Sequence, residues 1–240
     1  MEIRIHETKS QLNIEFTKWF KNILKKSGSI NVALSGGSTP KALFDYWANL
    51  PKGEIDWSKV KFFWGDERCV PPADEESNYR MTKEHLLDHI DIPENNIFRI
   101  KGENPPSEEQ YRYANILCSE VEQSGGVPSF DIMILGMGDD GHTASIFPYQ
   151  RNLWFSPQLC VEATHPDSGQ RRISLTGKVI NASKNVAFLV TGKNKSGKVK
   201  EIIEMSDKSA KIYPAALVKP KDGNLIWFLD NEAAELINNN

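Results

Sequence analysis

The chain has few cysteines, no strong excess of one charge and no long apolar run. Cys69, Cys118 and Cys160 are odd in number and form no C-x-x-C pair, which argues against a disulfide framework or a structural zinc site. A net charge of −3 at pH 7 lacks the basic excess that is typical of proteins that bind nucleic acid or anionic membranes. No segment approaches the roughly 20 apolar residues of a membrane helix. We therefore expect no nucleic-acid partner and no membrane partner.

Residues 1–6 also lack the apolar core of a signal peptide, which predicts a cytoplasmic protein. The sequence contains no internal repeat and no linker-like segment, since the Pro/Gly-rich stretches 101–106 and 124–128 resemble ordinary loops. A length of 240 residues suits one large α/β domain better than two. We predict a single domain over residues 1–240, present as a monomer or a weak homo-oligomer.

Near-continuous apolar runs of strand length alternate with helical patterns. Strands are predicted at residues 30–35, 60–64, 130–135, 185–191 and 225–229. Helices are predicted at residues 9–26, 40–48, 107–123 and 196–205, followed by a last helix over 231–237 with Asn231 as its N-cap. This alternation predicts a three-layer α/β/α fold around a mostly parallel, doubly wound, Rossmann-like sheet. In such a sheet, ligands bind beyond the carboxyl ends of the strands.

The segment Ser35-Gly-Gly-Ser-Thr-Pro40 follows the predicted strand 30–35 and precedes a helix. Gly36 and Gly37 let the backbone approach a ligand closely, and Ser38 and Thr39 offer hydroxyl and N–H groups at a helix N-terminus. These features favour a phosphate-binding loop. A tight strand-to-helix turn capped by a serine or threonine is the alternative that spacing alone leaves open.

Charged residues follow the next strand in the segment Gly65-Asp-Glu-Arg68. Arg68 is a candidate for binding an anion or an oxyanion, and Asp66 or Glu67 is a candidate for orienting it. Solvated loop charges are the alternative.

The segment Gly136-Met-Gly-Asp-Asp-Gly-His142 follows the predicted strand 130–135. Histidine is the residue type most often used as a general base near neutral pH, which makes His142 a candidate for that role. Asp140 is placed to fix its tautomer, provided that the backbone brings the two side chains together. The alternative is a glycine turn with a capping aspartate and a structural histidine.

Basic residues occur later in the chain. Arg172 lies in a further strand-like segment that begins at Arg171. Lys195 follows the strand predicted at 185–191, where it is a candidate for completing an anion site. His85 and His89 are one helical turn apart but lack a third ligand nearby, so a solvated helix face is favoured over a metal site. We predict no metal and no cofactor.

In combination, these motifs resemble the 6-phosphogluconolactonase family. That family shows S-G-G-S-T-P, W-x-D-E-R, G-x-G-x-D-G-H-T-A-S-x-F-P, R-x-x-L-T and G-x-x-K in this order. Here they stand at residues 35–40, 64–68, 136–148, 172–176 and 192–195, and the resemblance covers residues 30–200.

The resemblance implies a hydrolase of the pentose phosphate pathway that acts on 6-phospho-D-glucono-1,5-lactone without a metal. It further implies that His142 activates water and that Asp140 orients His142. Residues 36–39 would hold the phosphate, with Arg172 and Lys195 neutralising it. Arg68 would serve the oxyanion or the phosphate, and the sequence does not decide between these two roles.

Glucosamine-6-phosphate deaminases belong to the same larger fold group but differ at two motifs. They typically carry D-E-Y at the position of Asp66–Arg68 and N-G-H-I-A-F-N-E-P at residues 140–148. The catalytic glutamate of that second motif has no counterpart here. The residues therefore favour a lactonase over a deaminase or a sugar-phosphate sensor.

Overall fold

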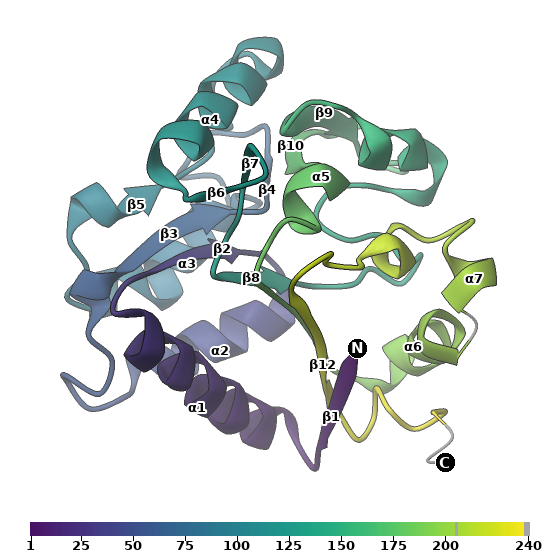
Figure 1. Ribbon diagram of the computed structural model, residues 1–240, viewed down its shortest axis with the longest axis horizontal. Helices are drawn as coiled ribbons and strands as arrows, with labels where there is room; N and C mark the ends of the chain where they lie inside the picture. The colour runs from purple at the N-terminus through teal and green to yellow at the C-terminus, as the bar shows by residue number, and fades with distance from the viewer. Residues whose placement is uncertain (205, 238–240) are drawn as a thin grey trace.

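Parallel strands form the centre of the molecule in the computed structural model, which describes residues 1–204 and 206–237 (Figure 1). Within these residues the sheet has seven strands in the order β1-β12-β11-β8-β2-β3-β5, and every neighbouring pair is parallel. The strands are β1 (Glu2–His6), β2 (Ile30–Leu34), β3 (Val60–Trp64), β5 (Ile97–Phe98), β8 (Ile132–Leu135), β11 (Asn185–Val190) and β12 (Asn224–Asp230).

The chain runs through this sheet in two directions from its middle. It steps from β2 to β3 and β5 on one side, and from β8 to β11 and β12 on the other. The predicted α/β fold with a doubly wound parallel sheet is therefore confirmed. The direction changes between the neighbouring strands β2 and β8, and such a switch point leaves a crevice at the carboxyl edge of the sheet.

Helices cover both faces of the sheet (Figure 1). Figure 1 shows α1 and α2 on one side of the sheet and α4 on the other. The helices are α1 (Lys9–Ser27), α2 (Ser38–Ala48), α3 (Asn78–His85), α4 (Pro106–Glu120), α5 (Gly177–Ile180), α6 (Ser196–Glu204) and α7 (Ser206–Ser209). Short 3₁₀ segments are η1 (Trp57–Lys59), η2 (Leu87–His89), η3 (Glu94–Asn96), η4 (Pro148–Phe155), η5 (Lys193–Lys195) and η6 (Pro214–Leu217).

Helix α1 illustrates how local sequence sets these elements. Thr8 caps its start by accepting the N–H of Gln11, and Gly28 ends it with a φ of +77° and an N–H bonded to the carbonyl of Leu24. Apolar side chains spaced four residues apart form its buried stripe: Leu12, Phe16, Phe20 and Leu24. Burial of each such side chain stabilises the fold by about 1.5–3 kcal/mol.

Two smaller antiparallel sheets extend the fold. One has the order β4-β10-β9, with β4 (Asp66–Arg68), β10 (Arg171–Leu175) and β9 (Cys160–Thr164). The other pairs β6 (Gln123–Ser124) with β7 (Val127–Pro128). Residues 66–68, for which solvated loop charges were the alternative considered, pair with β10. The stretch 124–128, expected to be an ordinary loop, lies in the β6–β7 hairpin, where Gly125 and Gly126 have the positive φ values of a tight turn.

The predicted helix over 231–237 is also wrong, because these residues form consecutive turns. The carboxylate of Asp230, rather than Asn231, accepts the first free N–H group, that of Ala233. Helix α2 begins at Ser38, two residues before the predicted start. Helix α4 ends at Glu120 rather than at residue 123, and the predicted end of α6 at Met205 lies outside the described residues.

Among the described residues, no helix has both the length and the apolar character needed to cross a membrane.

Candidate active site

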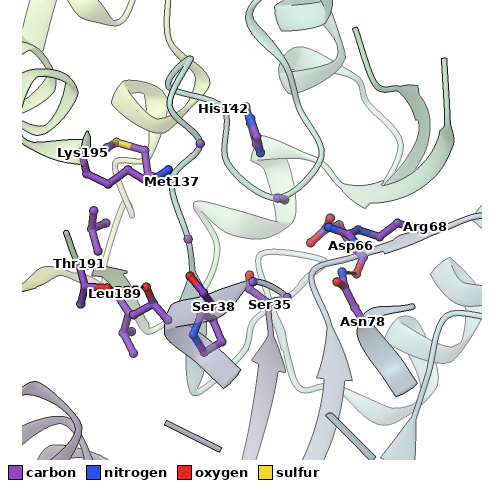
Figure 2. Close-up of a pocket in the computed structure, with 18 of the residues that line it drawn as sticks. Ser35, Ser38, Asp66, Arg68, Asn78, Met137, His142, Leu189, Thr191 and Lys195 are labelled. Atoms are coloured by element: carbon purple, nitrogen blue, oxygen red, sulfur yellow. Dashed lines mark hydrogen bonds between the residues drawn. The ribbon is translucent and has the colours of Figure 1, made fainter. Parts of the chain in front are cut away.

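A pocket of about 210 Å³ opens at the carboxyl ends of β2 and β8, where the chain changes direction (Figure 2). The loops that follow these two strands form much of its wall, and residues from β4, α3, β10, β11 and η5 also line it. Nine of the ten predicted site residues line the pocket: Gly36, Gly37, Ser38, Thr39, Asp66, Arg68, His142, Arg172 and Lys195. The tenth, Asp140, contacts His142.

Asp140 and His142 form a hydrogen-bonded pair. Oδ1 of Asp140 lies 2.7 Å from Nδ1 of His142 and also accepts the backbone N–H of His142 at 3.0 Å. Burial acts to raise the pKa of Asp140, but the hydrogen bond and the charge of His142 outweigh it, so this pKa lies below its usual value. An ionised Asp140 has no proton to donate, so Nδ1 of His142 must be the donor. Nε2 is then the nitrogen that is free to accept a proton.

The imidazole of His142 is held between a glycine and an aromatic ring. A Cβ atom added at Gly138 would lie 2.2 Å from Nδ1 of His142, so no other residue fits there without displacing the ring. The ring of Phe147 packs on the imidazole with centroids 4.7 Å apart, and Phe147 is itself buried. The orientation of His142 is therefore set by packing as well as by Asp140.

The loop after β2 presents the N-terminus of α2 to the pocket. Gly37 has a φ of +104°, a conformation that side-chain-bearing residues rarely adopt, and it directly precedes the first residue of α2, Ser38. Thr39 Oγ1 lies 2.8 Å from Oγ1 of Thr191, which anchors the loop to the end of β11. Free N–H groups and the helix dipole give this end of α2 a partial positive charge that favours anions.

Arg68 and Arg172 lie directly opposite each other on the antiparallel strands β4 and β10. The Nε atoms of both are buried and have no hydrogen-bond partner among the described residues. Burial, and then the charge of Arg68, lowers the pKa of Arg172. Like charges at opposed positions of a ladder repel each other. Nη1 of Arg68 donates to the carbonyl oxygen of Glu76, but within the described part of the chain both Nε–H groups remain without a partner. Two guanidinium groups with free Nε–H donors in one pocket are suited to binding an anion.

Asp66 links the small sheet to the loop that carries His142. Its Oδ2 accepts a hydrogen bond from Ser145 Oγ at 2.6 Å, and the residue is 5% exposed. Between His142 and Ser145, Ala144 adopts a φ of +48° and lines the pocket. A non-glycine residue in this region is strained, and such strain is common at functional sites.

Glu67 supports the pocket from outside by anchoring the start of α3. Its carboxylate accepts the backbone N–H groups of Arg68, Asn78 and Tyr79 and the hydroxyl of Ser77, at 2.7–3.0 Å. Burial raises the pKa of Glu67 to about 7, although the three backbone N–H groups act in the opposite direction. Glu67 therefore orients neighbouring residues rather than facing the pocket.

Asn78 is a pocket residue that sequence reasoning missed. It is 3% exposed, and its side-chain amide donates to the backbone carbonyl of Asp66 at 3.0 Å. A Cβ at Gly36 would lie 1.8 Å from Oδ1 of Asn78, so this glycine is required for close contact between the two segments. The available signal was the serine before Asn78, which caps α3 and marks a helix start just after the charged segment. The other missed lining residues are Ser35, Pro40, Gly136, Met137, Gly138, Ala144, Leu189, Val190 and Thr191.

Lys195 lies on the side of the pocket opposite Arg68 (Figure 2). Its Nζ forms an ion pair with Oδ1 of Asp139 at 2.5 Å, and Asn194 donates to the same oxygen at 3.1 Å. The pocket thus has cationic groups at both ends, with His142 between them.

The two histidines weighed as metal ligands have other partners. His85 Nδ1 lies 2.6 Å from Oδ1 of Asp45, and His89 Nε2 lies 2.9 Å from the carbonyl oxygen of Glu84. Across residues 1–204 and 206–237, no group of three or more His, Cys, Asp or Glu side chains is arranged to hold a metal ion.

Comparison with known proteins matches residues 6–227 to the family model described as glucosamine-6-phosphate isomerases/6-phosphogluconolactonase. The chain is 47% identical over 211 residues to a 6-phosphogluconolactonase of Haemophilus influenzae, which covers 87% of this chain and 88% of that protein. It is 43% identical over 202 residues to a 6-phosphogluconolactonase of Treponema pallidum, covering 84% and 83% of the two chains. The solved structure of 6-phosphogluconolactonase from Trypanosoma brucei superimposes with a TM-score of 0.85 at 29% identity, covering 99% of this chain and 98% of that one.

Proposed function

The chain belongs to the glucosamine-6-phosphate isomerase/6-phosphogluconolactonase family, and from this premise we propose that it hydrolyses 6-phospho-D-glucono-1,5-lactone to 6-phospho-D-gluconate. Its curated relatives are lactonases by name, and the chain is accordingly an enzyme of the lactonase class. The observation that carries the proposed chemistry is the Asp140–His142 pair at a pocket with cationic side chains at both ends.

The first step is attack of water on C1 of the lactone. Nε2 of His142 accepts a proton as the water oxygen bonds to C1, and the carbonyl oxygen takes on the negative charge. Asp140 supports this step because its carboxylate holds the proton on Nδ1 and stabilises the imidazolium that forms. The tetrahedral intermediate then collapses and the bond between C1 and the ring oxygen breaks. The imidazolium of His142 returns its proton to that oxygen, so the histidine is regenerated.

The phosphate is assigned to residues 36–39 at the N-terminus of α2, with Lys195 neutralising its charge. Arg172, which the resemblance gives to the phosphate as well, lies opposite Arg68 in the β4–β10 ladder and is therefore assigned to the same end of the pocket as Arg68. The helix terminus supports this assignment because its free N–H groups and dipole favour a phosphate. Fixing the remote phosphate positions C1 against His142, which converts substrate binding into correct orientation for attack.

Arg68 is assigned to the carbonyl oxygen of the lactone. It lies across the pocket from Lys195 (Figure 2), so a phosphate held at Lys195 places the other end of the ligand toward Arg68. A preorganised charge at a developing oxyanion typically contributes about 2.7–4 kcal/mol to lowering the barrier.

A turnover assay on freshly generated 6-phosphogluconolactone tests the reaction class, with the spontaneous hydrolysis rate subtracted. Acceleration well above this background, together with no ammonia release from glucosamine 6-phosphate, is the expected result. Ammonia release without lactone hydrolysis would place the chain with the deaminases of its family instead.

A further inference from the structure

The counter-ion of Lys195 has no role in the proposed reaction. Asp139 lies next to Asp140 but is bound in a different way: its Oδ1 pairs with Nζ of Lys195 at 2.5 Å and accepts the side-chain amide of Asn194 at 3.1 Å. The side chain of Asp139 is 71% exposed and that of Lys195 is 21% exposed. The ion pair therefore lies at the rim of the pocket, where a ligand and solvent can both reach it.

We propose that Asp139 competes with the phosphate of the ligand for Lys195 and thereby sets the affinity for phosphorylated sugars, an inference that rests on the phosphate site of the proposed function. The ammonium of Lys195 is a compact point charge. A phosphate that binds it must either displace the carboxylate of Asp139 or share the ammonium with it. Both arrangements weaken binding, since the first breaks an ion pair and the second places like charges side by side.

Competition of this kind affects the product as much as the substrate. Both carry the same phosphate, so Asp139 lowers the affinity for each and limits how strongly the product is retained. The effect is modest because the pair is partly exposed to solvent. An ion pair at such a site changes an equilibrium constant by up to about fivefold.

The test measures the dissociation constant of 6-phosphogluconate by isothermal titration calorimetry at low ionic strength. Asp139→Asn keeps an oxygen that accepts from Asn194 but removes the charge, and it should bind the product about two- to fivefold more tightly. Asp139→Glu restores the charge and should move the constant back toward that of the unaltered protein. Equal or weaker binding by Asp139→Asn would overturn the proposal.

Two further variants make the result specific. Glu235→Gln removes a negative charge that pairs with the neighbouring Lys193 at 3.0 Å. Lys193 does not line the pocket, so this control should leave the dissociation constant unchanged. If Glu235→Gln tightens binding as much as Asp139→Asn does, the gain comes from the change in net charge, and the role of Asp139 is refuted. In a Lys195→Ala background, Asp139→Asn should no longer tighten binding, because the two residues act on each other.

The same series separates this inference from the proposed function. If Lys195→Ala weakens binding but Asp139→Asn does not tighten it, the phosphate site stands and the role of Asp139 is refuted. If Lys195→Ala leaves binding unchanged, the phosphate is not at Lys195 and both proposals fail.

Discussion

Oδ1 of Asp140 accepts two hydrogen bonds from one residue, from Nδ1 and from the backbone N–H of His142. The backbone bond fixes where the carboxylate lies, and the side-chain bond fixes which nitrogen of His142 carries the proton. Asp140 and His142 are two residues apart in the sequence and form a preorganised unit because the glycine turn folds the chain back on itself. The N–H of Gly138 donates to the carbonyl of His142 at 2.9 Å.

Asp140→Asn tests this unit while keeping its shape. An asparagine has no negative charge and does not stabilise the imidazolium, so we expect kcat to fall by about 10²-fold or more. Circular dichroism and thermal unfolding should remain close to those of the unaltered enzyme. Undiminished turnover in a folded Asp140→Asn variant would show that His142 does not depend on this carboxylate.

Gly138→Ala tests the packing of the Asp140–His142 pair without replacing either residue, because a Cβ there would also lie 2.7 Å from Oδ1 of Asp140. The added methyl lies 2.2 Å from Nδ1 of His142, so the ring must move, and a displacement of about 1 Å at a reacting centre costs on the order of 10²-fold in rate. Gly197→Ala is the matched control, because a Cβ there meets no heavy atom within 4 Å and the residue lies in α6. That control should keep full activity and unfold at about the same urea concentration as the unaltered protein. Equal activity of the two variants would contradict the proposed constraint.

Substitution of Lys195 is expected to affect mainly phosphate binding, whereas substitution of Arg68 is expected to affect mainly the catalytic rate. Lys195→Ala should weaken binding of inorganic phosphate, measured by calorimetry, since it removes a cation from the proposed phosphate site. Arg68→Ala should leave phosphate binding little changed and should lower kcat by about 10²–10³-fold. A loss of phosphate affinity in Arg68→Ala that matches the loss in Lys195→Ala would assign Arg68 to the phosphate instead.

Glu67 provides a prediction about pH. Its pKa of about 7 in the folded protein lies above the ordinary value of 4.5, so the folded state binds a proton more tightly than the unfolded state. Its contribution to stability is therefore fully present below about pH 4.5 and is lost as pH rises through about 7. Glu67→Gln does not titrate. The difference in unfolding free energy between the unaltered protein and this variant, from urea denaturation, should fall by up to about 3 kcal/mol between pH 4.5 and pH 8. A difference that is constant or grows with pH would contradict this assignment.

Much of the fold was predictable because its strands are buried on both faces. All four residues of β8 are buried and four of the five residues of β2 are buried, which produces apolar runs that sequence reveals directly. Once the strands were recognised, the loops that follow them could be placed in the site, because the carboxyl ends of parallel strands lie at one edge of the sheet.

Features that depend on partners distant in the sequence were not predictable. Strand β4 is three charged residues with no apolar pattern, and it is a strand because β10 pairs with it about 100 residues later. Asn78 enters the pocket because buried Glu67 holds the start of α3 in place. The segment 231–237 has helical composition, but seven residues rarely sustain a helix in isolation, and the carboxylate of Asp230 caps a turn there instead.

The most direct measurement of the central claim is kcat for His142→Ala on freshly generated 6-phosphogluconolactone, with His165→Ala beside it. His165 packs against the same ring, that of Phe147, at 5.2 Å between centroids, but does not line the pocket. If His142 is the general base, its variant should lose about 10²–10⁴-fold in kcat while remaining folded, and His165→Ala should keep most of its activity. Turnover by His142→Ala at the rate of the unaltered enzyme would contradict the account.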